Sequence, residues 1–192
     1  RMPAMKPVLI PALVALVTAL PGAAHSPTIA SLRGASSSLP APVLPAAPEA
    51  PPSLAALAPD ADPQVLALGL SAMQCAQAHG TGVNAQRLAV IDYSRSSLTP
   101  RLWVFDLARH KLLYKELVAH GQGSGGDVPT TFSNADGTHA SSLGLFVTRD
   151  TYQGKNGYSL RMQGLDAGFN DAAMSRAIVM HGAPYVLSLI HI

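Results

Sequence analysis

The sequence predicts a mainly β domain, a sandwich or barrel, that follows one short helix and a long disordered segment. Six short apolar runs, separated by turn residues and glycine-rich connections, occupy about ninety residues of the C-terminal half, as in antiparallel β folds. All ten aromatic residues lie at or after Tyr93, whereas thirteen of the sixteen prolines lie at or before Pro63. We therefore expect one small hydrophobic core, formed by roughly the last hundred residues.

Residues 1–24 have the pattern of a secretory signal peptide. Lys6 precedes an apolar run at 8–20, and small residues follow up to Ala24. A short positive region, an apolar stretch of this length and a small-residue cleavage site together direct export. A membrane anchor is the weaker alternative, because the run is shorter than the ~20 residues that a bilayer requires. The pattern predicts an exported protein with no stable membrane span after cleavage.

Residues 25–62 are rich in Pro, Ala and Ser and have no apolar period, so we expect a disordered linker with extended segments. A helical segment at 63–79 follows, with its helix at Pro63–Ala78. Asp62 is a suitable N-cap, proline suits the first helical turn, and Gly80 can end the helix.

The only cysteine, Cys75, falls in this helix. It belongs to a broad apolar face that comprises Val65, Leu66, Leu68, Ala72, Met73, Cys75 and Ala76. We expect Cys75 to be a small buried hydrophobe rather than a nucleophile. A single cysteine also excludes a disulfide scaffold within the chain and a Cys-rich zinc module. The net charge of +2 excludes a strongly basic nucleic-acid binder.

Six strands are expected after the helix. They are Leu88–Tyr93, Leu102–Leu107, Lys111–Val118, Leu143–Thr148, Tyr158–Met162 and Ala177–Met180. The connection Gly121–Gly137 is long and begins with four glycines in six positions, and long loops in small domains are usually functional or mobile. No Lys-Ser or Lys-Thr follows these glycines, so a phosphate-binding P-loop is disfavoured.

Three histidines, His120, His139 and His181, each adjoin a predicted strand, and two of them are followed by glycine. They permit three interpretations: a three-histidine zinc site, unrelated loop residues, or one histidine that serves as the base for a cysteine nucleophile. The third interpretation requires a thiol that the chain does not visibly supply.

Nine sequence blocks between residues 87 and 186 occur in the order of one known family. They are VIDYS (90–94), RLWVFDL (101–107), VAHG (118–121), FSN (132–134), SSLG (141–144), TYQGKNGYSL (151–160), GL (164–165), ND (170–171) and RAIVMHGA (176–183). Together they resemble the YkuD-like murein L,D-transpeptidase catalytic domain. The resemblance implies a mainly β catalytic domain at 86–186 that acts on peptidoglycan stem peptides in the periplasm or cell envelope, without cofactor or metal.

In this family a cysteine thiolate displaces the terminal D-Ala of a stem peptide, and an amine of a neighbouring stem or water resolves the thioacyl enzyme. By position, His181 corresponds to the activating histidine, and Gly182 can offer its carbonyl to orient the ring. The resemblance places His120 and His139 in the cleft. It makes four further residues candidates for contact with the stem peptide, although they are equally suited to stabilising the surface of the fold. These are Tyr152, Lys155, Tyr158 and Arg161.

The chain departs from the family after His181. The nucleophile normally follows about twenty residues later in a motif like Ser-Trp-Gly-Cys-Pro, but only eleven residues follow here. Residues 187–192 resemble the translation of a sequencing-library adapter, and Arg1 precedes the first methionine. We therefore expect an inactive fragment of a transpeptidase. The alternatives are a non-catalytic wall-binding relative and, less favoured, a zinc hydrolase that uses the three histidines.

Overall fold

The computed structural model describes residues 12–17, 53–183 and 186. Most of the expected signal peptide and linker, and the expected adapter-derived tail at 187–192, lie outside the described residues. Within them, no helix is both long and apolar enough to cross a membrane.

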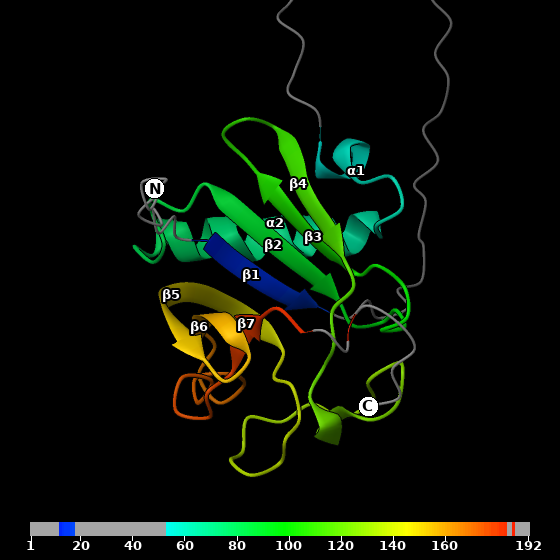
Figure 1. The fold of residues 1–192 in the computed structure, drawn as a ribbon. Coiled ribbons are helices and arrows are strands. Elements are labelled where there is room, and N and C mark those ends of the chain that lie inside the picture. The colour runs from blue at the N-terminus through cyan, green and yellow to red at the C-terminus, as the bar shows by residue number, and fades with distance from the viewer. Residues whose placement is uncertain (1–11, 18–52, 184–185, 187–192) are drawn as a thin grey trace, which may run out of the picture. The chain divides into compact units, whose positions relative to one another are not determined.

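The described residues form a mainly β fold, which confirms the predicted fold class (Figure 1). The seven strands of its sheet are β1 (Ala12–Val17), β2 (Arg87–Asp92), β3 (Leu102–Asp106), β4 (Lys111–Glu116), β5 (Gly144–Gly154), β6 (Gly157–Gly164) and β7 (Val179–His181). Their order is β4-β3-β2-β1-β5-β6-β7. Two antiparallel three-stranded groups, β2–β3–β4 and β5–β6–β7, are joined by β1, which is parallel to β2 and antiparallel to β5.

Strand β1 is the one strand of this sheet that we did not expect. Its residues are the middle of the apolar run attributed to the signal peptide, and they pair in register with β2, Ala15 opposite Val90. A run of Ala, Leu and Val suits a strand in the middle of a sheet as well as it suits an export signal. The signal peptide stays a prediction.

Helix α2 spans Pro63–Ala78, the range that the sequence predicts. The side chain of Asp62 caps it by accepting a hydrogen bond from the backbone N–H of Gln64 at 2.7 Å. A second, one-turn helix, α1 (Leu54–Leu57), lies in the segment expected to be a linker. Residues 53–62 adopt this structure because their Leu and Ala side chains pack on the core beneath α2.

The sheet carries a hydrophobic cluster on each face because side chains alternate along its strands. Leu88 and Val90 of β2 join Trp103 and Phe105 beneath α2, which packs against β1, β2 and β5 (Figure 1). On the other face, Ile91 belongs to a second cluster. This cluster comprises Ala89, Ile91, Tyr93, Leu102, Phe146, Met162 and Ala173.

The expectation that Cys75 is buried is wrong, because its side chain is exposed. The buried stripe of α2 consists of Val65, Leu66, Gly69 and Met73. Cys75 follows Met73 by two residues, so at 3.6 residues per turn it lies about 200° around the helix. The apolar face is therefore narrower than the composition suggests, and Leu68, which is 53% exposed, also falls outside it.

Candidate active site

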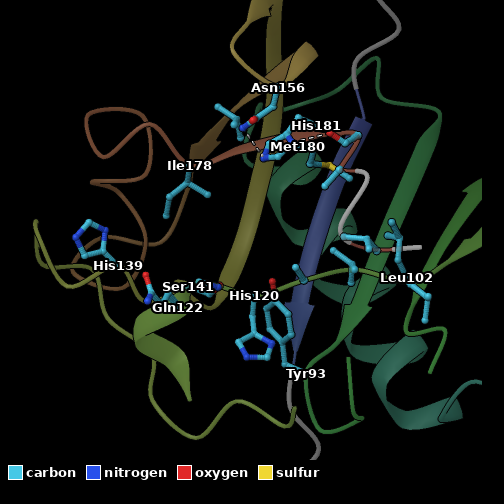
Figure 2. A pocket seen from close by; sticks show the side chains of 18 of the residues that line it. Tyr93, Leu102, His120, Gln122, His139, Ser141, Asn156, Ile178, Met180 and His181 are labelled. Carbon is cyan, nitrogen blue, oxygen red and sulfur yellow. Dashed lines mark hydrogen bonds between the residues drawn. The ribbon is translucent and has the colours of Figure 1, made fainter. Parts of the chain in front are cut away.

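A cavity of about 1150 Å³ opens on the sheet face away from α2 (Figure 2). Its walls come from the end of β4 and the following loop, from the loop before β5, from the tip of the β5–β6 hairpin and from β7 with its flanks. The lining residues are Tyr93, Leu102, Glu116, Leu117, Val118, Ala119, His120, Gly121, Gln122, His139, Ala140, Ser141, Asn156, Arg176, Ala177, Ile178, Val179, Met180, His181, Gly182, Ala183 and Val186. The three histidines singled out from the sequence all line this cavity.

His181 ends strand β7, and its two ring nitrogens have different partners. Nδ1 lies 2.9 Å from the carbonyl oxygen of Gly182. Because a carbonyl only accepts hydrogen bonds, this contact assigns the ring proton to Nδ1. Nε2 is then the basic atom, and it lies 3.4 Å from the side-chain nitrogen of Asn156 (Figure 2). A half-buried imidazole on a cavity wall, with Nε2 able to accept a proton, has the arrangement of a general base.

His120 is buried, and both of its ring nitrogens contact protein groups. A guanidinium N–H of Arg101 donates to Nδ1 at 2.7 Å. The assignment leaves the ring proton on Nε2, which faces the carbonyl oxygen of Gly125 at 3.4 Å. Burial lowers the pKa of His120, and the positive charge of Arg101 lowers it further. His120 is therefore neutral and connects the buried Arg101 to the glycine-rich loop.

The stability of the protein is expected to depend on the protonation of His120. Because the pKa of His120 lies below its ordinary value of 6.5, the unfolded chain takes up this proton at a higher pH than the folded chain. The free energy of unfolding should therefore fall as the pH drops from about 6.5 through the lowered pKa. Urea unfolding of the parent and of His120→Gln, between about pH 5 and pH 8, measures this slope. Equal slopes in the two proteins would contradict the assignment.

Arg101 and Tyr93 hold in place the chain on either side of His120. Arg101 is fully buried and donates to the carbonyl oxygen of Val118 through Nε at 3.0 Å and Nη2 at 2.8 Å. Its guanidinium lies 5.0 Å from the ring centre of Tyr93. Tyr93 hydrogen-bonds to Ser141, whose hydroxyl accepts from the backbone N–H of Gly121 at 2.9 Å. Burial raises the pKa of Tyr93, so its hydroxyl keeps its proton at neutral pH.

Two glycines of the glycine-rich loop are required by a close backbone contact. A Cβ added at Gly121 would lie 2.3 Å from the carbonyl oxygen of His139, and one added at Gly123 would lie 2.0 Å from that of Thr138. Neither position tolerates a side chain without displacement of the backbone. The glycines thus let two loops pack together along the cavity wall, where His139 is exposed.

The four residues proposed from the resemblance to contact the stem peptide are absent from the described cavity lining. They lie on the β5–β6 hairpin, where Arg161 and Tyr152 contact each other. The guanidinium of Arg161 lies 4.2 Å from the ring centre of Tyr152 and 3.3 Å from a carboxylate oxygen of Asp150. The hydroxyl of Tyr158 donates to that of Thr151 at 3.0 Å. Lys155 is exposed in the hairpin turn.

Asn156 and Arg176 are among the cavity residues that were not identified from the sequence as candidates. Asn156 lies beside Lys155 in the Gly-Lys-Asn-Gly turn, and such a turn signals an exposed hairpin tip but not its neighbour in space. Arg176 donates to the backbone carbonyl oxygens of Ser133 at 2.6 Å and Ala140 at 2.8 Å. It thereby ties the segment before β7 to the loop before β5.

In the part of the chain that the structure describes, no group of three or more His, Cys, Asp or Glu side chains is arranged to hold a metal ion. His120, His139 and His181 line one cavity, but they do not form a shared set of ligands. The zinc interpretation therefore has no support from the geometry.

Comparison with known proteins gives one match. A family model described as the L,D-transpeptidase catalytic domain matches residues 57–190, which is more than half of the chain. No curated protein matches the chain, and no solved structure does. The matched range contains α2, strands β2 to β7 and every described residue of the cavity lining. The chain belongs to the L,D-transpeptidase catalytic domain family.

Proposed function

We propose that this protein is a peptidoglycan L,D-transpeptidase of the cell envelope, with His181 as the base that activates a cysteine thiol. The observation that carries the proposal is the state of His181 in the cavity wall. Its Nδ1–H is held by the carbonyl of Gly182, so that Nε2 is left to accept a proton. The match to the family supports the reaction class.

The proposed reaction has two stages. The thiol proton passes to Nε2 of His181, and the sulfur bonds to the carbonyl carbon between the third stem residue and D-Ala. The C–N bond then breaks, and the departing D-Ala amine takes the proton from Nε2, which leaves a thioester. An amine of a second stem peptide attacks the thioester and regenerates the thiol, or water attacks it and forms a carboxylate. Throughout, the carbonyl of Gly182 accepts from Nδ1–H and stabilises the imidazolium.

The thiol is the part of this reaction that the described cavity does not contain. No described lining residue is a cysteine, and Cys75 lies on the exposed side of α2. We propose that the nucleophile belongs to a segment beyond His181 that this sequence does not include. The 192-residue chain is then inactive by itself.

Substrate contacts are proposed on two parts of the surface. His120 and His139 lie in the cavity wall. His139 is exposed there and can contact a peptide, whereas His120 is buried. On the β5–β6 hairpin, two side chains outside the described cavity lining, the exposed Lys155 and the half-buried Arg161, offer cations for the carboxylates of a stem peptide. The signal-like segment at 1–24 supports delivery to the cell envelope.

Release of D-Ala from a purified disaccharide-tetrapeptide tests the proposal. Mass spectrometry should detect D-Ala from the gene product extended through its next Gly-Cys, and none from the 192-residue chain. Replacement of that cysteine by Ala should abolish release and leave the fold unchanged. Release of D-Ala by the 192-residue chain, or none from the extended protein, would contradict the proposed nucleophile.

A wall-binding protein without catalysis is the second candidate function. The absence of a thiol from the described cavity lining favours it. This candidate would be supported over the first if the chain sedimented with isolated sacculi and if the extended gene product also released no D-Ala.

A further inference from the structure

We propose that Asn156 is a positioning residue for His181, and that it selects the ring tautomer in which Nε2 is the basic atom. The inference rests on the proposed function of His181 as a base. Asn156 is neither part of the His181–Gly182 pair nor one of the four hairpin residues proposed to contact the stem peptide.

Backbone pairing brings Asn156 to His181 from a distance of 25 residues along the chain. Gly154 and Gly157 close the β5–β6 hairpin, so Lys155 and Asn156 form its two-residue turn. Gly157 has a φ of +84°, a conformation that glycine adopts without strain. Ser159 of β6 then pairs with His181 of β7. The register of these strands therefore sets the hairpin tip beside the histidine ring.

The two contacts of His181 favour the same tautomer. The Nδ1–H donates to the carbonyl of Gly182 at 2.9 Å, and the amide nitrogen of Asn156 donates to Nε2 across 3.4 Å (Figure 2). In the opposite tautomer, a lone pair on Nδ1 would face the carbonyl oxygen, and an N–H on Nε2 would face the amide N–H. Both contacts would then become repulsive.

The orientation of the asparagine amide follows from the same logic. An amide turned by 180° would present its oxygen to Nε2 and would require a proton there. Because a neutral ring carries one proton, Nδ1 would then have none and would face the carbonyl oxygen of Gly182 with a lone pair. The orientation with the nitrogen toward His181 is the one that satisfies both ring nitrogens.

Asn156 is exposed, so its amide can move away from Nε2 when the thiol binds there. A neutral hydrogen bond of 3.4 Å is long and weak, so a thiol that comes next to Nε2, and that is acidic enough to give the ring its proton, can take the place of the amide. An aspartate at this position would behave differently, because a carboxylate only accepts and would draw the ring proton to Nε2. Asparagine therefore keeps the ring in the Nδ1–H tautomer and does not draw the ring proton to Nε2.

Histidine tautomers measured by NMR test this role without substrate or thiol. Long-range ¹H–¹⁵N correlation spectra of the ¹⁵N-histidine-labelled chain, at about pH 9 where histidine is neutral, distinguish Nδ1–H from Nε2–H. The signals of His181 are assigned by their loss in His181→Gln. We expect Nδ1–H to dominate in the parent, a mixture of tautomers in Asn156→Ala and a reversal to Nε2–H in Asn156→Asp.

The matched control is Gln153→Ala, an exposed change on the same hairpin, which should keep the parent's tautomer. Because residues 153 and 156 are both exposed, the thermal unfolding midpoint should stay unchanged in these three variants. Nε2–H in the parent, or the parent's spectrum in both Asn156 variants, would overturn the proposal. The spectra need no catalysis, so a failure of D-Ala release and a failure of this role are separate outcomes.

Discussion

Replacement of His181 by Ala is expected to lower the rate of D-Ala release about 100- to 10,000-fold in the gene product extended through its cysteine. Without the imidazole, the thiol keeps its proton at neutral pH, and the departing amine has no positioned acid. The carbonyl of Gly182 cannot compensate, because it only accepts hydrogen bonds. The measurement is kcat/KM for the tetrapeptide, with a single-turnover assay of the thioacyl enzyme.

His79→Ala is the matched control for this loss. His79 is an exposed histidine next to the end of α2, and it is absent from the described cavity lining. Its replacement should leave kcat/KM within about twofold of the parent, because surface changes remote from the site have small effects. Full activity in His181→Ala would assign the base to another residue.

Local sequence patterns were sufficient for the elements whose signals are contiguous. Asp62 and Pro63 predicted the start of α2, and short apolar runs bounded by turn residues predicted β2 to β7. Strand β1 was missed because its partners are distant in sequence: Ala15 pairs with Val90 on one side and Leu145 on the other. Pairing over 75 to 130 residues leaves no local signal, whereas the lysine and small residues around β1 match an export pattern.

The site divides in the same way. His181 was found from a contiguous block, but Asn156 reaches it only through the register of β6 and β7. The sequence also did not predict that His120 is buried against a cation, because a histidine after a strand can lie on either side of a loop. Its partner Arg101 is nineteen residues away and begins a run of apolar residues, where an arginine ordinarily marks an exposed position.

Replacement of Arg101 by Met is expected to lower the free energy of unfolding by about 3 kcal/mol. Methionine fills much of the same volume but cannot donate hydrogen bonds. Three acceptors then lose their donor: the carbonyl oxygens of Val118 and Arg95 and Nδ1 of His120. Each unsatisfied buried acceptor costs about 1–3 kcal/mol.

The opposing effect is the cost of burying the cation in the parent, which the substitution removes. Burial lowers the pKa of Arg101, so this cost is present, and the nearby negative charge of Asp92 acts against it. Four hydrogen bonds and the face of Tyr93 offset it further, so the lost contacts should outweigh the relief. Urea unfolding measures the difference, and hydrogen exchange should show faster opening at Gly121–Gly126.

Arg109→Met provides the comparison, because the side chain of Arg109 is 74% exposed where it pairs with the buried Asp106 at 3.4 Å. Such a pair contributes at most about 1 kcal/mol, so this variant should stay near the parent in stability and in exchange. If the free energy of unfolding of Arg101→Met also lay within about 1 kcal/mol of the parent's, the buried cation would make no net contribution to stability. The cavity wall would then be held by the packing of its glycines against the loop before β5 rather than by Arg101 and His120.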